Sequence, residues 1–212
     1  MEVNIEGNNF RLFEEKCLLW VDKNALLIAD LHLGKINHFR KSGIAVPSKP
    51  NDENIDRLIS LLQKTKPRRV IFMGDLFHSH YNPEWEVFGQ VIRYFPEVVF
   101  ELVVGNHDIM SGYQYEKVRL IRHDRPLKEG GLILSHEPLD TIEAGCYNIA
   151  GHIHPGVTLR GKGRQALRLP CFYFSQHHAL LPAFGQFTGT YRIKPQKGDK
   201  VVVIVEGKLM EV

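Results

Sequence analysis

Residues 98–108 read Val-Val-Phe-Glu-Leu-Val-Val-Gly-Asn-His-Asp, an apolar run that ends at a glycine and is followed by three polar side chains. The β-branched and apolar residues of the first part predict a buried strand, which Gly105 ends. A rigid scaffold commonly presents reactive groups from a loop at such a point, and here those groups are Asn106, His107 and Asp108. Taken alone, the stretch is equally typical of an ordinary turn, because Gly-Asn is common in turns.

Short apolar runs followed by polar residues recur earlier in the chain. Strands are predicted over residues 18–20, 25–29 and 70–73, and the last two end at Asp30-Leu31-His32 and at Gly74-Asp75. Helices are predicted from Asn51 or Asp52 to about Lys64 and from Pro83 to about Tyr94. Strands that alternate with helices indicate an α/β fold, in which sites lie beyond the ends of the strands.

The second half of the sequence has strand-like runs but little helical periodicity. We expect strands over residues 118–121, 132–135, 147–150, 167–174, 189–193 and 201–205, separated by Gly-rich or polar turns. There is no internal repeat and no linker rich in Pro or Ser. The sequence therefore predicts one domain over residues 1–212 that contains two sheets.

The composition indicates a globular protein of a reducing compartment. Hydrophobic residues make up 43% of the 212 residues and charged residues 24%, with a net charge of +3 that permits a polyanionic substrate without requiring one. Cys17, Cys146 and Cys171 are too far apart to predict a disulfide framework or a structural zinc site. We find no signal peptide and no apolar stretch of the ~18–20 residues that a membrane span needs. We therefore expect a cytoplasmic protein.

The polar residues that follow the predicted strands form a set suited to metal binding. They supply carboxylate, imidazole and amide groups but no thiolate, which suits Mn²⁺, Fe or Zn²⁺. Strands lying side by side would bring them to one edge, with enough ligands for two ions roughly 3.5–4 Å apart that share a carboxylate. The residues are Asp30, His32, Asp75, Asn106, His107, Asp108, His136, His152 and His154.

These motifs resemble, in kind and in order, those of the calcineurin-like metallophosphoesterases. They are Asp-x-His, Gly-Asp, Gly-Asn-His-Asp, a single His and Gly-His-x-His, and they cover residues 26–154. The resemblance implies a four-layer αββα sandwich of two mixed β-sheets flanked by helices. It also implies that Asp30, His32 and His154 hold a first metal ion, that Asn106, His136 and His152 hold a second, and that Asp75 bridges the two.

The resemblance further implies two catalytic residues, His107 close to the metals and Asp108 orienting its ring. In such a site two cations neutralise the phosphodiester and acidify a bridging water, whose hydroxide attacks in line with the leaving oxygen. A protonated His107 would stabilise the leaving alkoxide or protonate it, typically a ~10²–10⁴-fold effect. Asn106 is a neutral ligand and leaves the second ion strongly electrophilic.

A closer similarity is to the bacterial ligase-associated DNA-damage-response endonucleases. It rests on Asp30-Leu31-His32-Leu33-Gly34-Lys35, Gly74-Asp75-Leu76-Phe77-His78-Ser79, Ser135-His136-Glu137-Pro138, Gly151-His152-Ile153-His154-Pro155 and the block Leu181-Pro182-Ala183-Phe184-Gly185-Gln186-Phe187-Thr188-Gly189. This resemblance implies manganese-dependent cleavage of DNA phosphodiesters. It also implies a role in DNA repair beside a DNA ligase, an exonuclease and a helicase.

Several other polar residues have two interpretations. Lys35 could contact substrate phosphate and His78 could face the substrate, although exposed loop residues of these types commonly have no such role. A solvated surface is the better interpretation for the basic cluster, in which Arg119 and Arg122 would point to opposite faces of a strand. That cluster consists of Lys117, Arg119, Arg122 and Arg125.

Three functions are consistent with the sequence. The first is a two-metal phosphodiesterase that acts on DNA. The second is a phosphodiesterase or phosphatase that acts on small nucleotide substrates, because the chain has little sequence left for a separate nucleic-acid-binding domain. The third is a protein-binding scaffold on a phosphoesterase fold, which the retention of His107 and of the complete ligand set disfavours.

Overall fold

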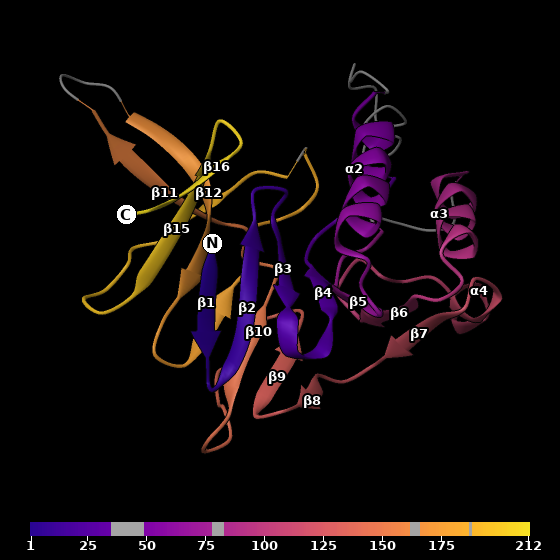
Figure 1. The fold of residues 1–212 in the computed structure, drawn as a ribbon, viewed down its shortest axis with the longest axis horizontal. Coiled ribbons are helices and arrows are strands. Elements are labelled where there is room, and N and C mark those ends of the chain that lie inside the picture. Colours follow the sequence, from indigo (N-terminus) through magenta and orange to yellow (C-terminus); the bar gives the residue numbers. More distant parts are fainter. Residues whose placement is uncertain (35–48, 78–82, 162–165, 187) are drawn as a thin grey trace.

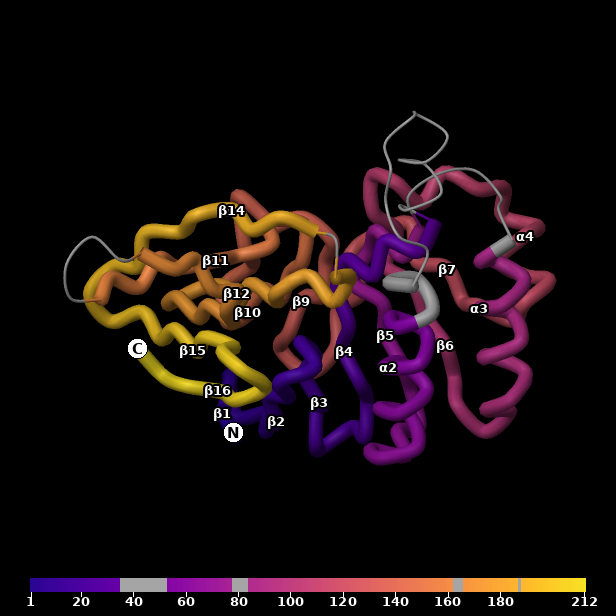
Figure 2. The backbone as a smooth tube through the Cα atoms, turned by 90° about the horizontal axis from the view of Figure 1, so that it is seen from above, coloured from indigo at the N-terminus to yellow at the C-terminus, as the bar shows by residue number. Residues whose placement is uncertain are grey.

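The computed structural model describes residues 1–34, 49–77, 83–161, 166–186 and 188–212. Two β-sheets form its centre, and the helices lie beside the first of them (Figure 1). Figure 2 shows α2 (Lys49–Thr65) and α3 (Pro83–Tyr94) on one side of the first sheet and the strands of the second sheet on the other. The sheets are therefore in contact through one face each.

The first sheet has seven strands that follow one another in chain order. The first four are antiparallel, whereas the fourth to the seventh are parallel and end at the same edge of the sheet. The strands are β1 (Glu2–Ile5), β2 (Asn8–Phe13), β3 (Cys17–Trp20), β4 (Ala25–Ile28), β5 (Arg69–Met73), β6 (Val99–Val103) and β7 (Leu120–His123), with the 3₁₀-helix η1 (Val21–Lys23) between β3 and β4.

The second sheet is also mixed and contains nine strands. Near one edge of this sheet, β9 (Leu132–Ser135) and β10 (Tyr147–Ala150) pair in parallel, and candidate site residues follow both strands. The other strands are β8 (Leu127–Glu129), β11 (Pro155–Arg160), β12 (Ala166–Phe174), β13 (His178–Leu180), β14 (Tyr191–Arg192), β15 (Lys200–Val205) and β16 (Lys208–Glu211).

Side chains on alternate positions of the strands of the first sheet fill two hydrophobic cores, one on each face of that sheet. In β4, Leu26 and Ile28 pack under α2 and α3, whereas Leu27 faces the second sheet, as the two-residue period of a strand requires. Apolar residues at helical spacing, such as Leu58 and Leu62 of α2, cover the outer face of the first sheet. The burial on both faces explains why the strands read as continuous apolar runs in the sequence.

The α/β fold with two mixed sheets agrees with the fold that the family resemblance implies, and its described helices cover the first sheet. The two mixed sheets are confirmed, but in the described part of the chain no helix follows α4 (Gly112–Lys117). The outer face of the second sheet instead buries Val157, Cys171 and Val203 against partly buried side chains such as Leu159 and Ile193. The scarcity of helical periodicity in the second half of the sequence agrees with this arrangement.

Candidate active site

The candidate site lies where the parallel strands of both sheets end. Asp30, Asp75 and Asn106 follow β4, β5 and β6, while His136 and His152 follow β9 and β10. Backbone hydrogen bonds hold neighbouring loops together: the Asp30 amide donates to the Gly74 carbonyl over 3.2 Å, and the Gly151 amide donates to the His136 carbonyl over 2.9 Å. The edges of the two sheets therefore form one continuous site.

Several candidate ligands have a left-handed backbone conformation. The φ angles are 54° at Asp30, 50° at His32, 49° at Asp75, 64° at His152 and 51° at His154. Residues other than glycine rarely adopt this backbone conformation, although Asp and His do so more often than most. The conformation turns these side chains into the site directly after each strand, and such backbones cluster at functional sites.

A first group of ligands consists of Asp30, His32 and His154, whose donor atoms lie within 4.8 Å of one another. His154 Nε2 is buried and accepts no hydrogen bond from the described residues, yet it lies 3.3 Å from Asp30 Oδ1. A buried nitrogen lone pair beside a buried carboxylate oxygen is unfavourable unless a cation or proton lies between them. This group therefore fits a divalent metal ion.

A second group consists of Asp75, His136 and His152, with donor atoms also within 4.8 Å of one another. The Met73 carbonyl lies 3.0 Å from His136 Nδ1 and places the ring proton there, which leaves Nε2 with a lone pair for a metal. His136 Nε2 lies 3.3 Å from Asp75 Oδ1 and 3.1 Å from His152 Nδ1. The second group thus has the donor chemistry of a Mn, Fe or Zn site.

The Asp75 carboxylate, a member of the second group, also faces the first group. Its Oδ1 faces His136 of the second group, and its Oδ2 lies 3.8 Å from His32 Nε2 of the first. Gly105 makes this position possible, because a Cβ atom there would lie 2.4 Å from the Asp75 amide nitrogen and 2.5 Å from Oδ1. One carboxylate therefore faces both groups of ligands.

Asn106 and Glu137 are joined by a hydrogen bond at the rim of the second group. Asn106 Nδ2 donates to Glu137 Oε1 over 2.6 Å, and this bond holds the pKa of Glu137 below its usual value. The same oxygen lies 3.8 Å from His152 Nε2. Glu137 belongs to one of the motifs that resemble the ligase-associated branch, but the sequence predicted no role for it. Its contact with Asn106 is therefore an interaction that the sequence analysis missed.

His107 lies beside Asp75, and Asp108 is buried behind it. The His107 amide donates to Asp75 Oδ1 over 3.0 Å, and its ring nitrogen Nε2 lies 4.0 Å from Asp75 Oδ2. Asp108 accepts hydrogen bonds from the Gly105 and Phe77 amides over 2.9 and 3.2 Å. Burial raises the pKa of Asp108 to about 6, although these two amides lower it. Asp108 thus ties the Gly105 loop to the loop that follows β5.

The segment after β13 supports the first group from behind. The Phe184 and Gly185 amides donate to the Ala29 and Asp30 carbonyls over 2.8 and 3.0 Å. Arg57 of α2 in turn donates to the Phe184 carbonyl, and its guanidinium lies 4.0 Å from the centre of the Phe184 ring. Phe184 and Gly185, which belong to the sequence block that resembles the ligase-associated branch, therefore support the backbone next to Asp30.

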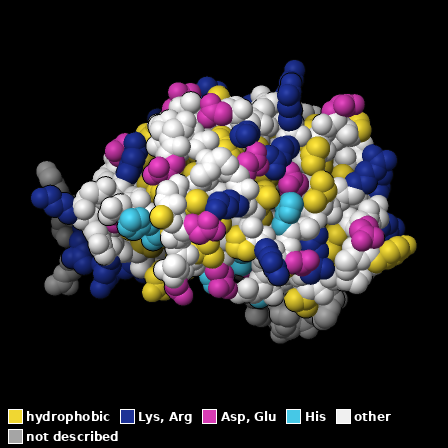
Figure 3. All heavy atoms as spheres, turned by 90° about the horizontal axis from the view of Figure 1, so that it is seen from below, with side chains coloured by type: hydrophobic (Ala, Val, Ile, Leu, Met, Phe, Trp, Pro, Cys, Tyr) yellow, Lys and Arg dark blue, Asp and Glu magenta, His cyan; other side chains and the backbone are white. Residues whose placement is uncertain are grey.

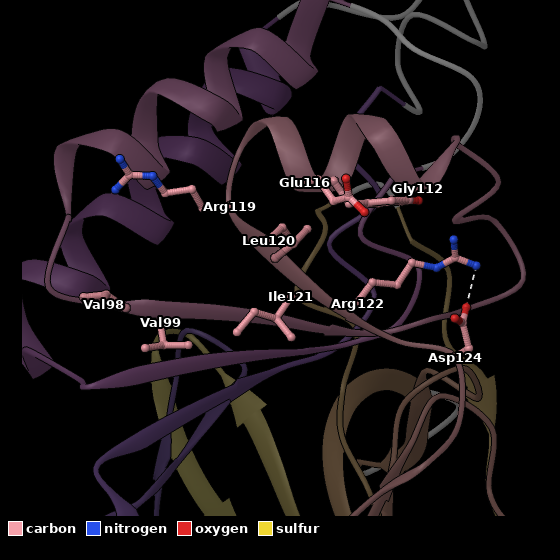
Figure 4. A pocket seen from close by; sticks show the side chains of 10 residues that line it. Val98, Val99, Gly112, Glu116, Arg119, Leu120, Ile121, Arg122 and Asp124 are labelled. Atoms are coloured by element: carbon pink, nitrogen blue, oxygen red, sulfur yellow. Dashed lines mark ion pairs between the residues drawn. The ribbon is translucent and has the colours of Figure 1, made fainter.

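The structure brings together the predicted residues that it describes. Lys35 and His78 lie outside the described residues. Arg119 lies before β7 and has a φ of 62°. It is therefore not part of the strand, and the prediction that Arg119 and Arg122 point to opposite faces of one strand does not apply. Arg119 and Arg122 line one groove of about 700 Å³ beside α4 (Figure 4). This groove is separate from the two ligand groups.

Comparison with known proteins defines the class of the enzyme. The family described as Calcineurin-like phosphoesterase matches residues 24–204, and the chain belongs to this family. It is a metallophosphoesterase that carries two groups of residues able to bind metal. No curated protein matches the sequence.

Among solved structures, the Pseudomonas putida nuclease MPE is similar over 100% of this chain and 99% of its own, with a TM-score of 0.84 and 28% sequence identity. This likeness is consistent with the ligase-associated branch that the sequence motifs resemble. The phosphoesterase Yfce from E. coli matches 89% of this chain and 97% of its own, at 13% identity and a TM-score of 0.45.

Proposed function

We propose that the protein is a metal-dependent phosphodiesterase that cleaves DNA, formed by one phosphoesterase domain over residues 1–212. The observation that carries the proposal is the position of Asp75, whose two carboxylate oxygens face two separate groups of ligands. A carboxylate shared in this way is the arrangement of two-metal hydrolytic sites.

In this proposal each ligand group holds one metal ion. Asp30, His32 and His154 hold the first ion, Asn106, His136 and His152 hold the second, and Asp75 bridges them. Two bound ions supply neutralisation of the phosphodiester and an acidified water as the nucleophile. Manganese is the ion we propose, with Fe or Zn as alternatives that an oxygen- and nitrogen-based ligand set also accepts.

The chain's own residues then act on the leaving group and on the geometry of the loops. The His107 ring lies beside Asp75 on the side of His32, with ring centres 5.8 Å apart, and it is half-exposed. From this position it can protonate or stabilise the leaving oxygen of a substrate that approaches from solvent. We propose that Asp108 orients His107, and its hydrogen bond from the Gly105 amide supports this role by holding the loop that carries His107.

DNA is the substrate we propose because the chain is similar over its full length to a protein described as a nuclease. A role in DNA repair, beside a DNA ligase, an exonuclease and a helicase, follows from the branch resemblance of the sequence motifs.

No helix in the described part of the chain is long and apolar enough to cross a bilayer. We propose a cytoplasmic location on the separation of the cysteines, which are free in the structure.

The experiment that tests this function uses purified protein that is stripped of metal and resupplied with Mn²⁺. Single-stranded, double-stranded and hairpin DNA are compared as substrates with bis-para-nitrophenyl phosphate and with a phosphomonoester. The proposal predicts cleavage of at least one DNA form, and its loss in Asp75→Ala and His107→Ala. These variants also guard against a contaminating nuclease.

Two results would overturn the proposal in different ways. Cleavage of the small diester or the monoester alone would support the proposed metal site but would overturn DNA as the substrate, in favour of a small nucleotide. Cleavage of DNA at the same rate by wild type and by Asp75→Ala would show that the activity does not belong to this site.

A further inference from the structure

A small pocket lies next to the second ligand group. It has a volume of about 190 Å³, and its walls include Asn106, His136 and Glu137 on one side. The other side is formed by the residues that follow β6 and β7, among them Asp124 and Arg125. The pocket therefore lies between the proposed metal site and Arg125, one residue of the basic cluster that was interpreted from the sequence as solvated surface.

Most of the charged groups around this pocket already have partners. Asp124 Oδ1 lies 2.5 Å from Arg122 Nη2, as the dashed line in Figure 4 shows. Glu137 accepts the hydrogen bond from Asn106, and its Oε1 lies 3.8 Å from His152 Nε2, next to the proposed second metal ion, whose positive charge would balance that of the carboxylate. His123 Nε2 lies 2.8 Å from Glu101 Oε2. Arg125, by contrast, is exposed and makes no ion pair with any residue in the described ranges.

The size and charge of the pocket select a phosphate group. Pockets for drug-sized ligands have volumes of roughly 300–1,000 Å³, so a cavity of about 190 Å³ is too small for a whole nucleotide but has room for a phosphate with its waters. A guanidinium group binds phosphate oxygens through two parallel hydrogen bonds. The uncompensated charge of Arg125 therefore favours an anion of this kind.

We propose that Arg125 binds the backbone phosphate next to the one that is cleaved, so that the pocket is a subsite for a polynucleotide. The inference rests on the proposed function, because only a chain with a second phosphate can occupy both places. On the face shown in Figure 3, positive and negative side chains are interspersed.

The test compares Arg125→Ala and Arg125→Lys with wild type and with Arg119→Ala. Arg119 is a matched control, because it is also an exposed arginine of the cluster but lines the groove of Figure 4 and not this pocket. The Mn²⁺-loaded enzymes are assayed for kcat/KM on an oligonucleotide and on bis-para-nitrophenyl phosphate, at several salt concentrations. The manganese content of each protein is measured in parallel.

For Arg125→Ala we expect the ratio of kcat/KM on DNA to kcat/KM on the small diester to fall about tenfold, in line with one lost phosphate contact. The slope of log(kcat/KM) on DNA against log salt should become shallower by about 0.7 to 0.9, the value for one phosphate. Arg125→Lys should restore the salt slope, since it keeps the charge. Manganese content should match that of wild type.

An unchanged ratio and salt slope in Arg125→Ala would overturn the inference, and so would equal effects of Arg119→Ala. Both results presuppose that wild type cleaves DNA. A wild-type protein that cleaves only the small diester would instead overturn the proposed function, and the subsite with it.

Discussion

The side chain of Asn106 donates a hydrogen bond to Glu137, with 2.6 Å between Nδ2 and Oε1. Because the amide nitrogen is held on the side of Glu137, the amide oxygen of Asn106 points the other way. An amide oxygen, not an amide nitrogen, binds a hard divalent cation. In the proposed two-metal site, Glu137 would therefore be a positioning residue that orients Asn106 toward the second metal ion.

Replacing Glu137 should weaken the second metal site. Glu137→Ala removes the acceptor, and we expect manganese affinity at one of the two sites to fall roughly 10–100-fold, the usual cost of losing such a supporting contact. Glu137→Gln keeps an acceptor oxygen and should remain close to wild type. Titration calorimetry of the metal-free proteins with Mn²⁺ measures the affinity of each variant and of wild type. Equal affinities in wild type and Glu137→Ala would contradict this role.

Gly105 should not tolerate a side chain. A Cβ atom at this position would lie 2.4 Å from the Asp75 amide nitrogen and 2.5 Å from Asp75 Oδ1, and neither the backbone nor the buried carboxylate can yield easily. Gly105→Ala should therefore lose bound manganese and phosphodiesterase activity. Gly189→Ala is the control, because nothing lies within 4 Å of an added Cβ there. Full metal content in Gly105→Ala would refute the prediction.

A buried carboxylate should contribute to the stability of the first sheet. Glu101 of β6 accepts a hydrogen bond from Arg69 Nε over 2.7 Å and lies 2.8 Å from His123 Nε2. Glu101→Ala should lower the free energy of unfolding by about 2 kcal/mol, because it removes the contacts of a buried carboxylate with Arg69 and His123 while Arg69 keeps its ion pair with Glu129.

The control for this prediction is Glu2→Ala, which removes the exposed ion pair between Glu2 and Arg11. It should cost no more than about 1 kcal/mol. Urea unfolding of both metal-free variants measures the difference, and equal losses would show that burial of Glu101 has no special effect.

Lys16 should make the stability depend on pH in the alkaline range. Burial, with a smaller effect of nearby Arg57, lowers the pKa of Lys16 to about 8 from a usual 10.5. Below pH 8 the folded protein must keep this partly buried lysine charged, so Lys16→Met should be more stable than wild type. Between pH 8 and 10.5 the folded state loses the proton before the unfolded state does.

The stability of wild type relative to Lys16→Met should therefore rise across this interval, by up to about 1.4 kcal/mol per pH unit. Lys66→Met is the control, because Lys66 is an exposed lysine that also has a left-handed backbone, with a φ of 44°. Denaturant unfolding at pH 7.5 and pH 10.5 measures the difference. If the difference in unfolding free energy between wild type and Lys16→Met does not change with pH, the lowered pKa of Lys16 is contradicted.

The sequence predicted the elements that carry the site because both of their faces are buried. The strands over 132–135 and 147–150 have the bounds observed for β9 and β10, and the predicted helix from 83 to 94 agrees with α3. Long apolar runs and a helical period are strong local signals. The N-terminal hairpin of β1 and β2 was missed, because exposed polar residues interrupt the apolar positions of these two short strands.

The geometry of the site depends on contacts that no local pattern encodes. The left-handed backbones of Asp30 and His152 arise from the packing of loops that belong to different sheets. Glu137 reaches Asn106 only because β6 and β9, in separate sheets, end side by side. Arg125 was interpreted as solvated surface for the same reason, since the pocket beside it is formed by residues distant in sequence.

The most direct test of the account is to measure bound manganese and DNA cleavage together while Mn²⁺ is added to the metal-free protein. The account predicts two ions per chain, with cleavage that appears only as the second ion binds. It also predicts that Asp75→Asn, which weakens the shared ligand, loses both the second ion and the cleavage. Full activity with one ion per chain, or two bound ions in a wild-type protein that cleaves no phosphodiester, would contradict it.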